Sequence, residues 1–289
     1  MMKQVILGLV LCFGGSLVAN AQKDNVNANK YLDYNYDKKA VKERKVVPYP
    51  PLREADVIYA KRVSRVIDTR EKKNMVMNWP KNPLNRVVYN FVTVGADTKG
   101  FGKLKAYRTD SLDVAMTIED VSKLGGFCET IGVQNPNNPD DIYDLIDSTV
   151  CTPFDYSQIN RWMINEEWIF DKQRGMFFPR IIAIAPLYKP NIGGVEMPEQ
   201  PMFYVNFEEL RPLLVNEEVF NRQNDAMRLT YYDFFEMRLF SSYITKESND
   251  KDFAINEFPE LKDNPMEALY ESERIREDLF NWEHDLWEY

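Results

Sequence analysis

The clearest alternation of hydrophobic and polar positions lies in residues 161–186. Its first half has the period of two that is typical of a half-buried strand, and the hydrophobic parity is interrupted only at Glu166: Trp162, Ile164, Trp168 and Phe170. A polar turn follows and ends at Gly175, a residue type that tolerates positive φ. A second hydrophobic run, residues 176–185, is stopped by Pro186. The pattern predicts a β-hairpin over about residues 159–186, whose second strand is central in a sheet.

Helical spacing appears on both sides of this hairpin in the sequence. Asn82 and Pro83 are typical of a helix start, and hydrophobic residues then recur at helical steps: Val87, Val88, Phe91 and Val94. Further helices are predicted over residues 118–124, 207–221 and 230–242. The last 24 residues form the clearest amphipathic helix, with one stripe of Ala268, Ser272, Ile275, Leu279, Trp282 and Leu286.

Strands are predicted between these helices. Residues 52–73 begin as a helical turn and pass into a strand, and shorter strands are expected over 103–108 and 202–207. Residues 125–139 and 189–200 are interpreted as loops because of their Gly, Pro and Asn content. The order of helices and strands is too irregular for a doubly wound parallel sheet. We therefore expect an α+β fold over residues 52–289, a single globular domain in which helices cover an antiparallel or mixed sheet built around the central hairpin.

The N-terminal residues do not belong to this domain. Residues 1–21 combine Lys3, an apolar run and the small-x-small sequence Ala19-Asn20-Ala21, which predicts a cleaved signal peptide. Residues 22–51 are poor in aliphatic side chains and are expected to form an extended arm. Two interpretations of this arm stay open: an adhesive strip for a partner, or a solvated tether. The tyrosines that would make it adhesive are Tyr31, Tyr34 and Tyr36.

Composition narrows the class of protein. A hydrophobic content of 44% in 289 residues is enough for a core. Loss of Lys3 with the signal would leave 35 of the 36 basic residues against 45 acidic ones, a net charge of −10. That charge argues against nucleic acid or an anionic membrane as the main partner. No later stretch reaches the roughly 20 apolar residues of a membrane span, so we expect a periplasmic or extracellular chain.

Candidate chemistry is sparse. The single histidine, His284, lies between two acidic neighbours and is interpreted as a packing or capping residue. Adjacent glutamates invite an acid–base mechanism, but sequential residues of a strand face opposite sides: Glu166/Glu167, Glu208/Glu209 and Glu217/Glu218. We therefore expect no catalytic, cofactor-binding or metal site. Cys128 and Cys151 could form a disulfide in an oxidising compartment or remain as two thiols.

Several phrases read in order resemble one family. They are LREADVIYAKRVSRVIDTREKKN at 52–74, EEWIFDKQRGMFFPRIIAIAP at 166–186, FNRQNDAMRLTYYDFFEMRLFSSYITKESN at 220–249 and EHDLWEY at 283–289. The chain resembles the GldN/PorN family of gliding motility and type IX secretion proteins. Residues 123–157 depart from the pattern as an insertion, and Ser64 stands where an aromatic residue is expected.

The resemblance implies a non-enzymatic, periplasmic component without cofactors. It would assemble into a large ring with an outer-membrane lipoprotein of the GldK/PorK type, which would hold it at that membrane, and would contact a GldM/PorM-like motor shaft. The residues we expect to bind partners are Tyr31, Tyr34, Tyr36, Arg161, Trp162, Trp168, Trp282 and Trp287. The alternative is a secreted carbohydrate-binding or hydrolytic module that uses exposed aromatic side chains with Glu166 and Glu167.

Overall fold

The computed structural model describes residues 44–93, 104–124, 127–134, 145–152, 154–192 and 195–285. The chain divides into two units, Met1–Lys42 and Glu43–Tyr289, and all described residues belong to the second unit. The predicted signal peptide and most of the predicted arm therefore lie outside the described residues.

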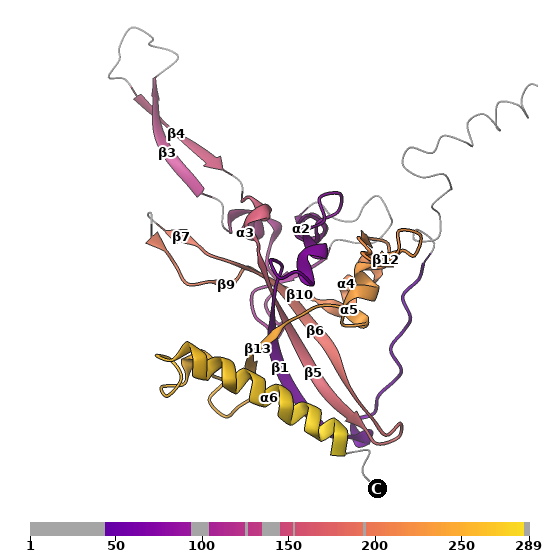
Figure 1. Ribbon diagram of the computed structural model, residues 1–289. Coiled ribbons are helices and arrows are strands. Elements are labelled where there is room, and N and C mark those ends of the chain that lie inside the picture. The colour runs from indigo at the N-terminus through magenta and orange to yellow at the C-terminus, as the bar shows by residue number, and fades with distance from the viewer. Residues whose placement is uncertain are drawn as a thin grey trace, which may run out of the picture. The chain divides into compact units, whose positions relative to one another are not determined.

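A seven-stranded antiparallel sheet forms the centre of the described unit (Figure 1). Six strands follow the order β13-β1-β5-β6-β10-β2, and the seventh, β9, pairs with the end of β6. Their bounds are β1 Val57–Asp68, β2 Ala106–Tyr107, β5 Arg161–Asp171, β6 Met176–Tyr188, β9 Gln200–Pro201, β10 Tyr204–Asn206 and β13 Tyr243–Glu247. The predicted α+β class is confirmed, and so is the central hairpin, which is β5–β6.

Strands β1, β5 and β6 form the long framework of this sheet. β5 pairs with β6 from Arg161↔Leu187 to Asp171↔Met176, and Gly175 in the turn has a φ of +59°. On its other edge β5 pairs with β1 along the same length. Because side chains alternate between the two faces of each strand, this shared register decides which residues meet the core and which face away.

Helices cover one face of the sheet at the end where β5 begins. α2 (Leu84–Thr93), α4 (Phe207–Leu214) and α5 (Tyr231–Glu236) contribute to the main core. The strands supply the opposite wall of this core through Ile67, Trp162, Ile164, Ile184 and Val205. Side chains define where the short helices start: Asn206 Oδ1 accepts the Glu208 amide at α4, and Thr230 and Asp233 form a capping box at α5.

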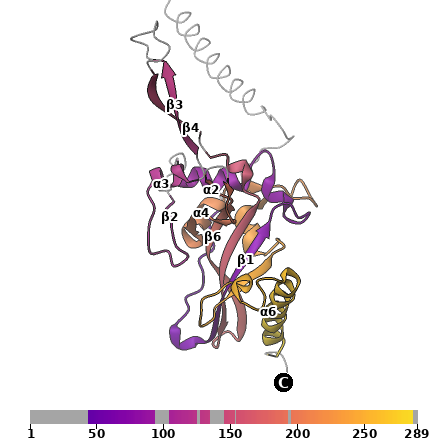
Figure 2. The same cartoon turned by 90° about the vertical axis from the view of Figure 1, so that its left-hand side faces the viewer.

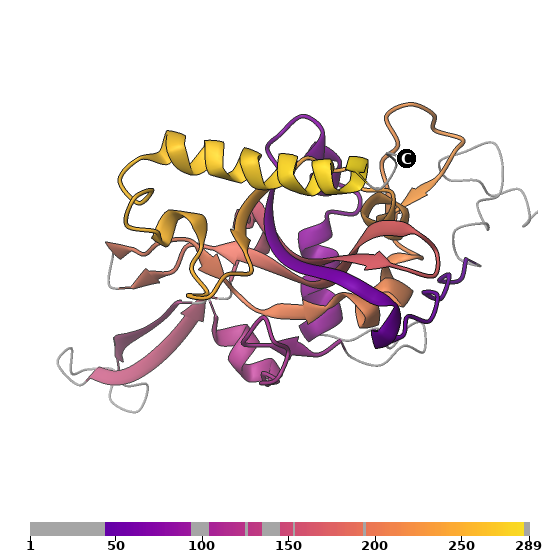
Figure 3. The ribbon, with the colours of Figure 1, turned by 90° about the horizontal axis from the view of Figure 1, so that it is seen from below.

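The C-terminal helix α6 (Pro265–Asp285) packs beside β13 with a second, smaller core. Ser272, Ile275 and Leu279 of the predicted stripe are buried, which confirms the amphipathic helix, whereas Leu286 lies outside the described residues. Figure 2 shows α6 apart from α2, α3 (Ile118–Lys123) and α4, and Figure 3 shows it lying over β13 and β1. It therefore covers a part of the sheet that the other helices leave bare.

Four expectations about local structure were wrong. Within the range expected as a loop over 125–139, the described residues 127–134 form strand β3 (Phe127–Gln134), which pairs with β4 (Leu145–Thr152) in a two-stranded antiparallel sheet. The helices expected over 207–221 and 230–242 end at Leu214 and Glu236. The remainder of the first contains a short strand, β11 (Glu218–Val219), which pairs with β12 (Leu229–Thr230) at the residues just before α5. The loop expected over 189–200 contains β7 (Asn191–Ile192) and β8 (Val195–Glu196). Strand β13 was not expected. Cross-strand pairing, which the periodicity of one segment does not reveal, forms these strands; the partner is close in sequence for β7–β8 and β11–β12 and distant for β13.

The last residues of the predicted arm are fastened to the body. Arg211 of α4 is only 3% exposed; its guanidinium donates to Val47 O at 2.8 Å and lies 3.5 Å from the ring centroid of Tyr49. The hydroxyl of Tyr49 donates to Glu236 at 2.7 Å, and Glu236 is also ion-paired with Arg211 at 3.0 Å. Burial and this bond to Glu236 raise the pKa of Tyr49 well above its ordinary value.

Two further arginines hold the same segment. Arg180 of β6 donates to Pro50 O at 3.0 Å and lies over the Tyr49 ring. Arg44 makes a two-pronged pair with Asp233 of α5, with nitrogen–oxygen distances of 2.5 and 2.9 Å. Residues 44–50 are therefore an extended strap on α4, α5 and β6, although they contain no helix or strand.

We predict that removing residues 22–51 lowers the free energy of unfolding by about 2–4 kcal/mol, because Arg211 and Glu236 lose partners at a buried site. For a domain of this size that is a fall in Tm of roughly 5–10 °C. Removing residues 22–43 keeps the strap and should leave Tm within about 2 °C. Thermal unfolding followed by circular dichroism compares the two truncations. Equal melting temperatures would show that the strap contributes nothing.

Candidate interaction groove

The face of the sheet opposite the main core carries a groove. Register pairs Ser64 with Asn165 and Val66 with Met163, one position out of phase with the core pair Ile67 and Trp162. Ser64, Val66, Met163 and Asn165 therefore point away from α2, α4 and α5, and so does Leu187 of β6. They form the floor of the groove.

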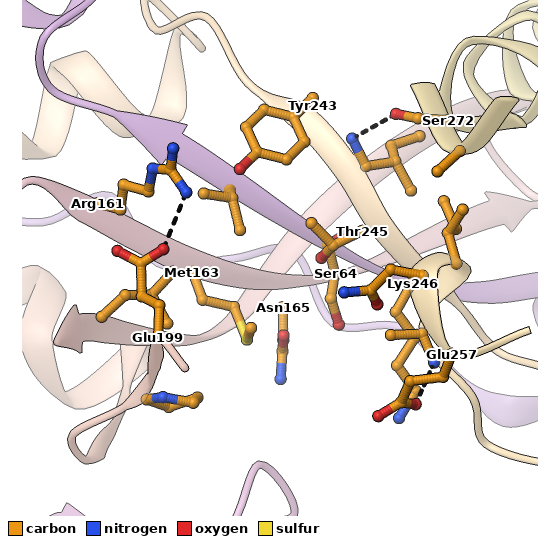
Figure 4. A pocket seen from close by; sticks show the side chains of 18 of the residues that line it. Ser64, Arg161, Met163, Asn165, Glu199, Tyr243, Thr245, Lys246, Glu257 and Ser272 are labelled. Atoms are coloured by element: carbon orange, nitrogen blue, oxygen red, sulfur yellow. Dashed lines mark hydrogen bonds and ion pairs between the residues drawn. The ribbon is translucent and has the colours of Figure 1, made fainter. Parts of the chain in front are cut away.

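Segments distant in sequence build the walls (Figure 4). One wall comes from the chain around Pro198–Pro201, with Tyr204 and Asp110, and the other from β13, the 3₁₀-turn Ile255–Glu257 and the first two turns of α6. The volume of the groove is about 720 Å³, which lies within the range of ligand-sized cavities. The groove is large enough to hold several side chains of a bound peptide.

Asn165 is the unusual residue of the floor. Its side chain is 3% exposed, and its amide oxygen Oδ1 has no hydrogen-bond partner. A buried polar atom without a partner costs free energy, so such atoms are rare and point to a partner supplied from outside. In Figure 4 the side chain of Asn165 points into the groove between Met163 and Ser64.

Charged residues line the rim. Arg161 is held between Asp68 at 3.2 Å and Glu199 at 2.9 Å, and Lys246 pairs with Asp252 at 2.6 Å. Within the part of the chain that the structure describes, no basic side chain forms an ion pair with the two remaining carboxylates, Asp110 and Glu257. Burial, with the charge of Asp110, raises the pKa of Tyr204 to about 12. The rim therefore has an excess of negative charge.

The outer edge of the sheet next to the groove is protected. The backbone amide of Ile244 in β13 donates to Ser272 Oγ of α6 at 3.0 Å. Because this amide faces away from β1, a side chain takes the place of another strand. We therefore regard the groove, and not the β13 edge, as the candidate site for a ligand.

The glutamate pair of the hydrolytic alternative does not form a site. Glu166 is fully buried between two guanidinium groups, Arg65 at 3.2 Å and Arg238 at 2.8 Å, and both lie near the ring of Trp168. Burial lowers the pKa of Arg65, although Glu166 opposes this effect. Glu167 stands on the other face of β5, in register with Arg180. The two carboxylates therefore cannot act on one substrate.

The partner-binding residues expected from the sequence have different surroundings. Arg161 is half-buried in the groove. The expectation for Trp162 was wrong: its side chain is 1% exposed and its Nε1 donates to Asn85 at 3.1 Å, so it is a core residue. Trp168 is half-buried beside Phe177, and Trp282 is 41% exposed and stacked on Tyr59 at 4.4 Å.

The other expected residues are placed only in part. Those outside the described residues are Tyr31, Tyr34, Tyr36 and Trp287. The backbone register makes Cys128 and Cys151 direct partners across β3 and β4. His284 is exposed on α6, with its ring 6.5 Å from that of Phe280. Sequence reasoning missed Asn165, whose only signal was a polar side chain on the less hydrophobic parity of β5.

No group of three or more His, Cys, Asp or Glu side chains suited to a metal ion occurs among the described residues. None of the helices in the described ranges has the length and apolarity to cross a bilayer. The fold is that of an α+β domain with a groove on the face of the sheet opposite the main core.

Residues 52–288 match the family model of the gliding motility associated protein GldN, and the chain belongs to this family. It is therefore a component of the gliding motility and type IX secretion machinery, in a family that is not one of enzymes. A comparison with curated proteins gave no match.

We predict that Glu166→Gln lowers the free energy of unfolding by about 2–4 kcal/mol, because it leaves Arg65 buried with a weakened partner. The neighbouring change Glu167→Gln is the matched control and should cost less than about 0.5 kcal/mol, because this side chain is only partly buried. Denaturant unfolding measures both. Equal effects would show that the buried ion cluster does not contribute to stability.

Proposed function

We propose that this chain is a non-enzymatic structural subunit of the type IX secretion and gliding motility machinery. It assembles into a large ring with an outer-membrane lipoprotein of the GldK/PorK type and contacts a periplasmic shaft protein of the GldM/PorM type. The observation that carries this proposal is the family match over residues 52–288. The surroundings of Glu166 support it. This residue was the best candidate for a catalytic carboxylate, and its side chain is buried in ion pairs with two arginines.

The proposed location is the periplasm, at the outer membrane through the lipoprotein partner. The signal-like pattern of residues 1–21 and the membership of a secretion-machinery family support it. The net charge of −9 is consistent with proteins, and not nucleic acid, as the main partners. No observation in the described residues favours the carbohydrate-binding alternative.

Co-expression with a lipoprotein of the GldK/PorK type tests this proposal. We expect the two proteins to co-purify through a tag on the lipoprotein and to elute as an assembly far larger than a heterodimer, with rings visible in electron micrographs. The same chain expressed without the lipoprotein is the control for size. A chain that stays monomeric and is not captured in co-expression would contradict the proposed function.

We also propose that Cys128 and Cys151 form a disulfide in the exported protein. Residues directly opposite each other on antiparallel strands have Cα atoms about 4.5 or 5.5 Å apart, within the range of Cα separations that a disulfide spans. The register Cys128↔Cys151 supplies this placement. Two thiols would lose two protons and two electrons to a disulfide-containing oxidant of the envelope, which is reduced to a dithiol.

We therefore predict that the protein purified from the envelope without reductant is lighter by two hydrogen atoms than the fully reduced chain. Neither thiol should react with a maleimide until a reductant is added. In the variant Cys128→Ser the remaining thiol should react at once. Intact-mass spectrometry after labelling measures this, and maleimide on both cysteines of the unreduced wild-type protein would disprove the bond.

A further inference from the structure

We propose that the groove binds the basic segment 38–42 from the arm of a second copy of this chain. This inference rests on the proposed function for its setting and goes beyond it by naming the contact through which copies join. It is carried by three features of the groove: an unpartnered buried amide oxygen, an apolar floor and an acidic rim.

The groove favours an extended, cationic peptide with a small apolar centre. Val66, Met163 and Leu187 offer apolar contact on the floor, and Asn165 Oδ1 lacks a donor that a peptide N–H or a lysine ammonium would supply. Asp110 and Glu257 stand on different walls without ion-pair partners among the described residues. A peptide with cations on both sides of an apolar residue would satisfy all of these groups.

The arm contains such a peptide. Residues 38–42 read Lys-Lys-Ala-Val-Lys, so that Lys38, Lys39 and Lys42 flank Ala40 and Val41. Opposite charges on the two surfaces favour encounter and set the register of binding. Residues 44–289 contain 41 of the 45 acidic residues but only 30 of the 36 basic ones, so this part of the chain is acidic, whereas residues 38–42 are a basic run outside it.

The anchoring of the strap favours a second copy as the donor. Arg44 is tied to Asp233 of α5, which packs on the core face of the sheet, whereas the groove floor is on the other face. Lys38 is six residues from Arg44, a reach of at most about 20 Å. To enter its own groove the segment would have to pass around the sheet within that length, whereas a neighbouring copy can present its groove directly.

A contact between the arm of one copy and the groove of the next is heterologous. Such a head-to-tail contact repeats from copy to copy and closes into a ring when the rotation between copies allows it. The strap keeps Val47 and Pro50 on their own copy, so a segment that contacts another copy lies before residue 44. The arm would then join subunits while the folded domain keeps its own core intact.

The test uses the full mature chain with a photo-crosslinking amino acid at Ala40, prepared in isotopically light and heavy forms and mixed before irradiation. Mass spectrometry should identify peptides that join residue 40 of one form to groove residues such as Met163 of the other. The double variant Asp110→Lys and Glu257→Lys should reduce these crosslinks about tenfold. Adding Lys38→Glu, Lys39→Glu and Lys42→Glu to that variant should restore most of them.

The matched control is the double variant Glu54→Lys and Asp225→Lys, which makes the same charge change at exposed residues outside the groove and should leave the crosslinks unchanged. The experiment is run on the chain alone and on its complex with the lipoprotein. Crosslinks confined to single copies, or none to the groove in either preparation, would overturn the proposal. Failure of the lipoprotein to be captured is a separate result, because copies of this chain are mixed without it.

Discussion

The whole described unit depends on the continuous antiparallel pairing of β1, β5 and β6. The three strands keep one register over their length, apart from bulges, so each side chain is committed to one face of the sheet. On one face Ile67, Trp162 and Ile164 meet the helices of the main core. The residues between them in sequence are thereby placed on the other face, where they line a groove.

Buried charge adds a second constraint on the same framework. Glu166 interrupts the hydrophobic parity of β5, and it remains buried because Arg65 and Arg238 neutralise it from a neighbouring strand and from the end of α5. The register shift between β5 and β6 occurs at Asn165 and Glu166. Asn165 and Glu166, two polar residues that the hydrophobic pattern does not explain, thus lie next to each other at one bulge. The ion cluster of Glu166 is on one face of the sheet, and the unpartnered amide oxygen of Asn165 is on the other.

These features suit a subunit that works by contact. The ion cluster buries the carboxylate of Glu166, which a hydrolase would need exposed. The strap ties the start of the described chain to α4 and α5 through Arg211 and Arg44. The described unit thus combines a strap fastened to α4 with a groove on the face of the sheet away from the main core. This arrangement agrees with a family whose members are parts of a secretion and motility machine.

The sequence by itself determined the class of fold, the β5–β6 hairpin, the existence of α2 and the amphipathic α6, because each depends on local periodicity and turn residues within a short stretch. It placed the start of α2 one residue early, since the Asn82 side chain bonds to Glu217 and Glu218 instead of capping the helix. It did not determine the ends of α4 and α5, the strands β3 and β13, or the burial of Trp162, because these depend on pairing and packing with other segments of the chain. The sequence did not reveal the groove either. Asn165 and Tyr204 are unremarkable in sequence, and Ser64 was noted only as a departure from an expected aromatic residue. The pairing of strands brings the three together, and hydrogen bonds between segments far apart in the chain leave no periodic signal in either one.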